Sequence, residues 1–375
     1  MNIRNCLSDC KRIVVKVGTS TLTHSNGKLN LQRIERLVRE LADLHNRDRE
    51  VLLVTSGAIG IGASRMGYKK VPRTMPEKQG LAAIGQGTLL HIYEKIFAEY
   101  GKTVAQVLLT REDLDERLRY LNATNALQAI LNMKVIPIIN ENDTVAVEEI
   151  KFGDNDTLSA LVAGLINADF LLILSDVDGL YDCDPRTHKE ARLQSEVYEI
   201  TDVMQENSTH RGSRFSSGGM LTKLHAARIC MASGIPMIIA NSNQTDVIRR
   251  IIDGEQLGTL FVPREEKMHA RMKWIAFGTV LQGSIVIDAG ARTALVDKGK
   301  SLLPSGIIRI EGEFDRGMVV GVVTADGQQV ARGMVNYNSQ ELQLIAGRKS
   351  QDIEKILGAK DYDEVIHRNN LWVEA

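Results

Sequence analysis

The sequence contains few cysteines, and none of them are closely paired. The four cysteines among its 375 residues are Cys6, Cys10, Cys183 and Cys230, and no Cys-x2-Cys pair occurs. Structural zinc sites and disulfide frameworks require closely spaced or paired cysteines, so we expect neither. Scattered cysteines fit the reducing conditions of the cytosol, and we therefore expect a cytoplasmic protein.

Long apolar runs and an excess of charge of either sign are also missing. The first apolar run, Ile13 to Val17, has only the length of a strand. We therefore expect no signal peptide, no membrane-spanning segment and no membrane partner. The 46 lysines and arginines nearly balance the 47 aspartates and glutamates, which gives a net charge of −1. This balance provides no general attraction to nucleic acid, so we do not expect nucleic acid as a partner.

Residues 1–262 alternate between predicted strands and predicted helices. Short apolar or β-branched runs predict strands at 13–17, 51–54, 103–109, 135–139, 170–174 and 236–240. Helical spacing of apolar residues predicts helices at 31–44, 77–99, 118–132, 157–166 and from residue 221. The alternation is typical of an α/β fold with an open, mainly parallel sheet between layers of helices.

The pattern changes after Val262. Residues 263–276 are rich in charge and are expected to form a linker that includes a helix over 263–273. From residue 277 to 375 the predicted strands are short and glycines are frequent, which favours a small all-β domain. The tail from Gln351 is expected to form a short helix. We therefore expect a domain over 1–262, a linker over 263–276 and a second domain over 277–375.

Polar residues follow four of the predicted strands. They are Lys16 with Gly18 and Thr19, Thr55-Ser56-Gly57, Asn140 to Asp143, and Ser175-Asp176. The carboxyl ends of parallel strands meet at one edge of an open sheet, where ligands bind. A lysine in a strand as apolar as the first one needs an anionic partner. Lys16 could instead be a solvated lysine of an edge strand, although a strand this apolar favours a central position. Ser56 could be a simple turn residue, and Asn155 or Asp156 could merely cap the helix predicted from Thr157.

A glycine turn that opens a helix is the main candidate for a phosphate-binding loop. The stretch reads Ser216-Ser217-Gly218-Gly219-Met220-Leu221-Thr222-Lys223, and helical spacing begins at Leu221. Free backbone N–H groups at a helix start suit a phosphate, and a lysine in the first turn adds a full charge. The spacing differs from Gly-x4-Gly-Lys-Ser/Thr, so this is not a Walker A loop. The alternative is a surface loop with a solvated lysine.

Lys16, Lys223 and the carboxylates near them fit phosphoryl transfer. That reaction needs charge stabilisation and in-line positioning more than covalent chemistry. No general base is required if the acceptor is itself a carboxylate, because carboxylates ionise near pH 4.

Two other motifs fail on spacing. The acidic stretch from Asp176 to Asp182 has its glycine in the fourth position, so it is not an EF-hand loop. Gly57-Ala58-Ile59-Gly60-Ile61-Gly62 follows a strand, but its order is not that of the dinucleotide-binding fingerprint, which argues against an oxidoreductase.

Taken together, these residues resemble the amino acid kinase family over most of residues 11–262. The matching stretches are Lys16 to Ser20, Thr55 to Ile59, Ile138 to Asp143, Gly153 to Asp156, Asp178 to Tyr181, Asp184-Pro185-Arg186 and Gly218 to Lys223. Asp288 to Ala291 and Ser301 to Ile307 are similar to a PUA domain, a fold that is often found in RNA-modifying enzymes. A kinase domain followed by PUA is typical of the bacterial members that phosphorylate glutamate.

The resemblance implies ATP-dependent phosphorylation of the glutamate γ-carboxylate with magnesium, as the first step of proline biosynthesis. It implies that Lys16 and Lys223 stabilise the transferred phosphoryl group and that Asp156 orients them. The residues implied to hold glutamate are Ser56, Asn140, Asp143 and Asn155. Those implied to hold the nucleotide are Lys16, Ser175, Asp176, Ser217, Gly218, Gly219, Met220, Leu221, Thr222 and Lys223. The family usually reads Gly-Thr-Gly-Gly-Met, so Ser216 replaces a glycine here.

The resemblance also implies partners. It implies proline as an inhibitor, a homo-oligomer, and a partnership with glutamyl phosphate reductase. Two alternatives to the glutamate reaction are another carboxylate or phosphate kinase of this family, and an RNA-binding protein that uses the PUA-like domain. Residues 277–375 contain 11 lysines and arginines against 13 aspartates and glutamates, a net charge of −2, which is a weak basis for RNA binding.

Overall fold

The computed structural model describes most of the chain. The described residues are 3–24, 27–68, 70–146, 155–183, 185, 188, 190–201, 204, 219–263, 275–276 and 279–374. The chain divides into two compact units, Met1–Lys267 and Met268–Ala375. The helix expected over 263–273 falls almost wholly outside the described residues. None of the helices in the described ranges is long and apolar enough to cross a lipid bilayer.

The first unit is built on a mainly parallel sheet. Within the described residues its strand order is β3-β4-β2-β1-β5-β7-β8-β6. The strands are β1 Arg12–Val17, β2 Glu50–Val54, β3 Val104–Leu109, β4 Ile136–Glu141, β5 Phe170–Ser175, β6 Glu196–Val197, β7 Met237–Asn241 and β8 Thr259–Phe261. β7 and β8 pair antiparallel, and the other pairings between these eight described strands are parallel. The six strands predicted from the sequence are confirmed, and the short strands β8 and β6 at one end of the sheet were not expected.

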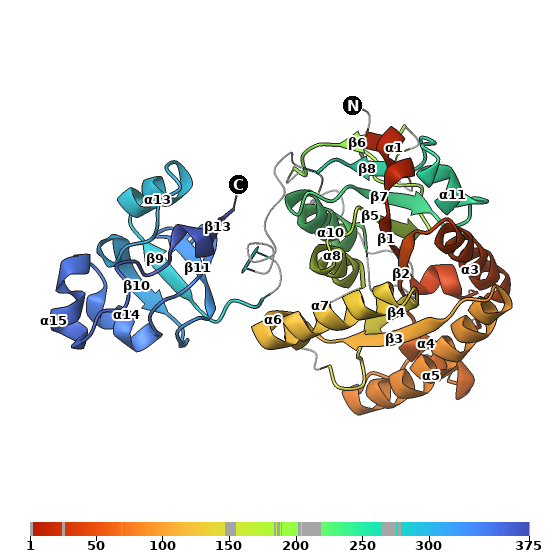
Figure 1. Ribbon diagram of the computed structural model, residues 1–375, viewed down its shortest axis with the longest axis horizontal. Coiled ribbons are helices and arrows are strands. Elements are labelled where there is room, and N and C mark those ends of the chain that lie inside the picture. Colours follow the sequence, from red (N-terminus) through yellow and green to blue (C-terminus); the bar gives the residue numbers. More distant parts are fainter. Residues whose placement is uncertain are drawn as a thin grey trace. The chain divides into compact units, whose positions relative to one another are not determined.

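Helices cover both faces of this sheet (Figure 1). On one side α8 (Asn155–Leu165) packs against β1, β5 and α10 (Met220–Ala232), and α7 (Arg117–Asn132) packs against β4. On the other side α3 (Leu31–Asn46) contacts β2, α5 (Met75–Glu99) and α11 (Val247–Ile252). The helix α4 (Ala58–Arg65) lies against α5, and the short helices are α1 (Ile3–Cys6), α2 (Thr19–Leu22) and α6 (Arg111–Asp115).

The direction of side chains along β1 decides where its lysine lies. Ile13, Val15 and Val17 are fully buried in the core cluster that includes residues of α3, α5 and α11. Successive side chains of a strand point to opposite faces. Lys16 therefore points toward the opposite face, which α8 and α10 cover. The position of the lysine in this apolar strand therefore places its ammonium group beside α8 and α10.

The second unit contains a five-stranded sheet in the order β10-β9-β11-β12-β13, as described over residues 279–374. The strands are β9 Ser284–Ile287, β10 Ile307–Glu311, β11 Val319–Thr324, β12 Gln329–Met334 and β13 Leu371–Val373. The strand-rich character is confirmed, but helices α13 (Ala289–Val296) and α14 (Ser339–Ile345) were not expected. The short helix expected in the tail is α15, Ile353–Leu357.

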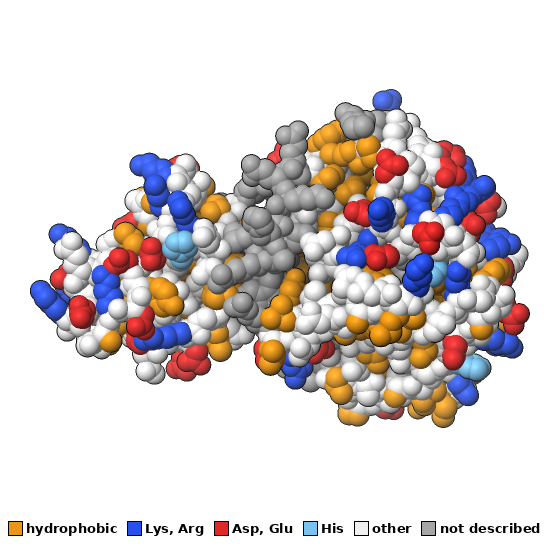
Figure 2. Space-filling model, viewed as in Figure 1, with side chains coloured by type: hydrophobic (Ala, Val, Ile, Leu, Met, Phe, Trp, Pro, Cys, Tyr) orange, Lys and Arg blue, Asp and Glu red, His pale blue; other side chains and the backbone are white. Residues whose placement is uncertain are grey.

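The visible surface of both units carries mixed charge. In Figure 2 acidic and basic side chains are interspersed over the described residues of this face, and neither sign forms a large field there. This distribution matches the near-zero net charge of the chain.

Candidate active site

Four adjacent strands bring their carboxyl ends to one edge of the sheet. β4, β2, β1 and β5 are neighbours and run parallel. The polar segments that the sequence places after these strands therefore lie side by side, as expected. They are Lys16 to Thr19 at the end of β1, Thr55 to Gly57 after β2, Asn140 to Asp143 at the end of β4, and Ser175-Asp176 at the end of β5. Lys16, Ser56, Asn140 and Ser175 therefore lie at this edge.

Asp156 at the start of α8 joins the two lysines. One carboxylate oxygen, Oδ1, forms an ion pair with Lys16 Nζ from β1, and Oδ2 lies 3.1 Å from Lys223 Nζ on α10. The hydroxyl of Thr222 donates to the same Oδ2 at 2.9 Å. Asp156 is fully buried, and Lys16 and Lys223 are only 6% and 7% exposed. Two ammonium groups from different elements thus meet at one buried carboxylate.

The lysines determine the protonation state of Asp156. Burial by itself raises the pKa of the carboxyl group, because the charged form loses water. The ammonium groups of Lys16 and Lys223 outweigh this effect and hold the pKa of Asp156 well below its usual range. The carboxylate is therefore ionised at neutral pH and compensates part of the charge of both lysines. The trio keeps a net positive charge, which suits an anionic ligand.

Asn155 connects the ends of β2 and β4. Its amide nitrogen Nδ2 lies 3.0 Å from Ser56 Oγ and 2.7 Å from Asn140 Oδ1, and it also donates to the backbone oxygen of Thr55. Asn140 is 2% exposed, whereas Ser56 and Asn155 are half-buried. Three of the four residues that the resemblance assigns to glutamate therefore form one hydrogen-bonded cluster.

The simple capping alternative is wrong for Asn155 and Asp156. α8 begins at Asn155, earlier than the sequence pattern suggested. The side chain of Asn155 reaches across to β2 and β4, and that of Asp156 reaches the two lysines. Tertiary contacts therefore explain these side chains better than local capping does.

The end of β5 lies on the side of β1 that is opposite β2. Ser175 is buried and its hydroxyl donates to Asp176 at 3.2 Å, while Asp176 is exposed. Asn241, at the end of β7, donates to Asp178 at 2.9 Å. Gly219 is the N-cap of α10, so the glycine turn does open a helix. The predicted nucleotide-binding residues Ser217 and Gly218, and Ser216 before them, fall outside the described residues.

The first turns of α10 carry the remaining predicted nucleotide-binding residues. Met220 is half-buried and Leu221 is 43% exposed at the start of the helix. Thr222 and Lys223 point instead toward Asp156, as their contacts show. The predicted first-turn lysine therefore pairs with a buried carboxylate and is not solvated.

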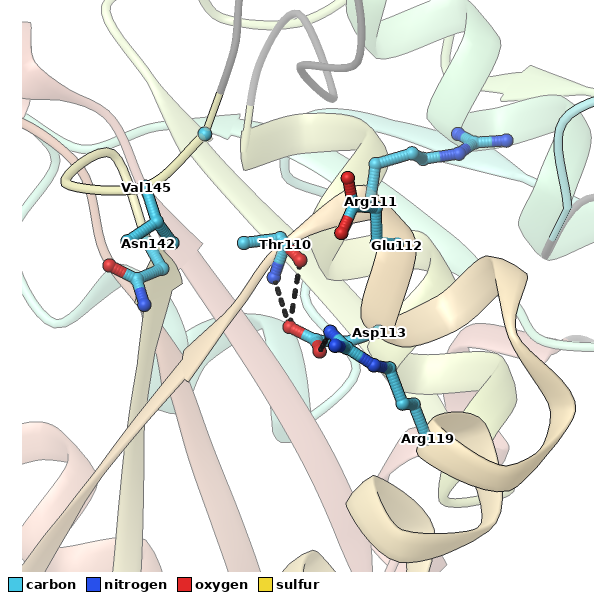
Figure 3. A pocket seen from close by; sticks show the side chains of 8 residues that line it. Thr110, Arg111, Glu112, Asp113, Arg119, Asn142 and Val145 are labelled. Carbon is cyan, nitrogen blue, oxygen red and sulfur yellow. Dashed lines mark hydrogen bonds and ion pairs between the residues drawn. The ribbon is translucent and has the colours of Figure 1, made fainter.

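A pocket of about 340 Å³ opens beside the turn that follows β4 (Figure 3). Its lining residues are Thr110, Arg111, Glu112, Asp113, Arg119, Asn142, Val145 and Ala146. Asp113 Oδ2 accepts from the backbone and hydroxyl of Thr110, and Asp113 Oδ1 pairs with Arg119 at 3.0 Å. Asp143, the fourth predicted glutamate-binding residue, is half-buried in the turn beside Asn142. The pocket thus adjoins the proposed acceptor side.

The described residues contain no group of three or more His, Cys, Asp or Glu side chains arranged to hold a metal ion. Both oxygens of Asp156 are occupied by the lysines and Thr222. A magnesium ion in a kinase is usually bound by one or two carboxylates together with substrate phosphates, so a dedicated cage of side chains is not required.

Comparison with known proteins identifies the family. Residues 11–241 match the amino acid kinase family, and residues 283–357 match the PUA domain. The chain belongs to the amino acid kinase family. Lys16, Asp156 and Lys223 all lie within the matched part of this kinase, as does the Ser56–Asn140–Asn155 cluster.

Curated relatives of the kinase match over its full length. It is 54% identical over 376 residues to the glutamate 5-kinase of Moorella thermoacetica, which covers 100% of both chains. It is 55% identical to that of Caldanaerobacter subterraneus, over 96% of this chain and 97% of the relative. It is 47% identical to that of Geobacter sulfurreducens, over 98% of each. Among solved structures, UMP kinase from Bacillus anthracis aligns with a TM-score of 0.48 at 20% identity, over 69% of this chain and 99% of that one.

Sequence reasoning missed two residues that contact the site from α5. Gln86 accepts a hydrogen bond from Asn140, and the hydroxyl of Tyr93 lies 3.0 Å from that of Thr55. Both lie within a predicted helix whose pattern gave no functional signal. One signal was available: Gln86 stands between two glycines, and glycine inside a helix destabilises it unless close packing requires it.

Proposed function

We propose that this kinase transfers the γ-phosphoryl group of ATP to the γ-carboxylate of L-glutamate and forms γ-glutamyl phosphate. The observation that carries this proposal is the buried Lys16–Asp156–Lys223 trio at the carboxyl edge of the sheet. The full-length match to proteins named glutamate 5-kinase supports glutamate as the acceptor.

The trio accounts for the chemistry of the transfer. Negative charge spreads over the oxygens of the phosphoryl group as it passes between donor and acceptor. Lys16 and Lys223 come from a strand and a helix on two sides of Asp156, so they stabilise that charge from two directions. Asp156 fixes both ammonium groups before the substrates bind. The acceptor carboxylate is already ionised at neutral pH, so no general base is required.

Glutamate and ATP bind on different sides of the site. The Ser56–Asn140–Asn155 cluster and Asp143 bind glutamate, with Asp143 pairing with its ammonium group. Ser175, Asp176 and the residues from Ser217 to Lys223 bind ATP, because the helix start of α10 suits phosphate groups. Magnesium bound together with ATP would be held chiefly by phosphate oxygens and would supply positive charge there.

The proposal extends to regulation and assembly. Proline shares an α-carboxylate and a cationic amine with glutamate, so it competes for the acceptor side. The kinase forms a homo-oligomer, acts in the cytoplasm, and passes γ-glutamyl phosphate to a reductase. The product is an acyl phosphate that hydrolyses readily, which favours direct transfer.

An ADP-release assay tests the proposed reaction. Purified protein is supplied with MgATP and, separately, glutamate, aspartate, acetylglutamate or uridine monophosphate. We expect ADP release to depend on glutamate, with the other acceptors at least about tenfold slower. ADP release with another acceptor, and not with glutamate, would refute the glutamate assignment while leaving the family unaffected.

A further inference from the structure

Gln86 on α5 is a buried polar residue outside the proposed catalytic trio. It is 8% exposed, and its Oε1 accepts a hydrogen bond of 2.7 Å from Asn140 Nδ2. Its own Nε2 is buried and has no hydrogen-bond partner among the described residues. An unsatisfied buried amide destabilises a protein. The contact that explains a glutamine at this position is therefore the one made by its oxygen.

That contact sets the direction of a chain of amides. An amide oxygen can only accept a hydrogen bond and an amide nitrogen can only donate one. Because Gln86 presents its oxygen, Asn140 turns its nitrogen toward α5 and its oxygen toward Asn155. Asn140 Oδ1 also accepts from the backbone N–H of Glu141 at 2.9 Å, which reinforces the same orientation. Asn155 in turn directs its nitrogen at Asn140, Ser56 and Thr55.

The consequence concerns the oxygen of the Asn155 amide. Because the nitrogen of this amide donates to β2 and β4, the oxygen is the amide atom that Asn155 can offer to a ligand. A carbonyl oxygen accepts from an ammonium group and repels a carboxylate. The direction of the amide chain therefore determines which end of an amino acid acceptor is favoured beside Asn155.

The position of α5 is fixed by close contacts, so Gln86 can determine the orientation of the Asn140 amide. Gly85, the residue before Gln86, packs against α4 so tightly that a Cβ there would lie 1.8 Å from the backbone oxygen of Ala58. About two helical turns after Gln86, the fully buried Tyr93 places its hydroxyl 3.0 Å from Thr55 Oγ1. The helix is thus tied both to the start of α4 and to the end of β2, next to Ser56.

We propose that Gln86 is a positioning residue that orients Asn140 and, through it, Asn155, so that the site selects acceptors with an α-ammonium group. This inference rests on the proposed glutamate reaction. Gln86 does not touch the substrate. It acts through the two asparagines. Without Gln86, the amide of Asn140 can rotate and turn its nitrogen toward the nitrogen of Asn155, and the hydrogen bond between the two asparagines is then lost.

Two substitutions at Gln86 separate this role from a packing role. Gln86→Met keeps the length of the side chain and removes the acceptor oxygen. Gln86→Glu keeps an oxygen that can accept from Asn140. A packing role favours methionine and disfavours a buried carboxyl group, whereas the positioning role requires the reverse order for substrate binding. Gln86→Leu repeats the test with a second apolar side chain, and Leu89→Met, at a fully buried apolar position on the same helix, is the matched control.

The experiment measures steady-state kinetics with glutamate and with glutarate, which lacks the ammonium group. We expect Gln86→Met and Gln86→Leu to raise the glutamate KM on the order of tenfold, since one buried hydrogen bond is lost and its donor is left unsatisfied. The ATP KM should stay within about twofold, and the preference for glutamate over glutarate should fall by a similar factor to the rise in KM. Gln86→Glu and Leu89→Met should retain the glutamate KM of the unsubstituted protein.

An unchanged preference for glutamate over glutarate in both apolar variants would overturn the inference. So would an equal rise in the KM values for glutamate and ATP, which indicates a general loss of structure. The unsubstituted protein decides the underlying reaction separately: absence of glutamate-dependent ADP release refutes the acceptor, whatever the variants do.

Discussion

The fully buried carboxylate of Asp156 forms an ion pair with Lys16, and this contact joins the start of α8 to β1 in the middle of the sheet. A second lysine, Lys223, approaches the other oxygen from α10. A buried charge is tolerated only when it is paired, so each member of the trio depends on the others.

Removing Lys223 should impair the chemical step. We expect Lys223→Ala to lower kcat by on the order of 100-fold or more, because a cation that stabilises transition-state charge is lost. The KM values should change modestly. Arg228→Ala, at an exposed position on the same helix, should keep near-normal kinetics. Steady-state assays measure both, and a near-normal kcat in Lys223→Ala would be incompatible with the two-lysine mechanism.

Replacing Asp156 should destabilise the fold in a pH-dependent way. The folded-state pKa of Asp156 lies below its unfolded value, so its ionised form contributes stability above about pH 4, and this contribution is lost as the pH falls further. We expect Asp156→Asn to lower the free energy of unfolding by about 3–5 kcal/mol at pH 7, because two lysines lose their buried partner.

The difference in the free energy of unfolding between the unsubstituted protein and Asp156→Asn should become smaller below about pH 4. Denaturant unfolding of both proteins at pH 7, 5 and 3.5 measures this difference. A difference that stays constant or widens on acidification would contradict the assigned ion pairs.

A side chain at Gly57 should strain the turn after β2. It follows Ser56 with a φ of +98°, and an added Cβ would lie 3.3 Å from the side chain of Thr19. We expect Gly57→Ala to lower the free energy of unfolding by about 1–2 kcal/mol and to raise the glutamate KM, because Ser56 shifts with the turn. Gly67→Ala provides the control: its φ is +77° with open space around it, so the strain is similar but the KM should not change. Equal glutamate KM values in the two variants would show that Gly57 does not affect glutamate binding.

The first unit should act alone. Each proposed catalytic and substrate-binding residue lies before residue 224, and the compact units divide at Lys267 and Met268. We expect a chain that ends at residue 273 to fold and to phosphorylate glutamate. Circular dichroism and ADP release measure the two properties, and a folded fragment without activity would contradict the prediction.

Proline should inhibit competitively with glutamate, through a shared contact with Asp143. A charge-assisted pair with the amine of either ligand is strong when partly desolvated. We therefore expect Asp143→Asn to raise the glutamate KM and the proline inhibition constant together, while the ATP KM changes little. Initial-rate kinetics with both ligands varied measure these constants. A shift in the ATP KM alone would place Asp143 on the nucleotide side instead.

Local sequence was sufficient for the main elements of the fold. Apolar β-branched runs bounded by polar turns identified the six long strands of the first unit, because strands that are buried on both faces are largely apolar. The same reasoning failed for β6, with two residues, and β8, with three, since so short a segment carries no periodicity. The helices α13 and α14 were missed for a similar reason: each is at most eight residues long and lies among glycine-rich turns.

The meeting of Lys16, Ser56, Asn140 and Ser175 at one edge could be predicted from the sequence alone, because parallel strands align their carboxyl ends. The sequence could not decide what those side chains contact. Asp156 is paired with two lysines, and Gln86 accepts from Asn140, only because α8, α10 and α5 pack against the strands in one particular register. Such contacts join residues 54 to 140 positions apart, and no local pattern specifies a partner at that distance, since it depends on how whole helices pack.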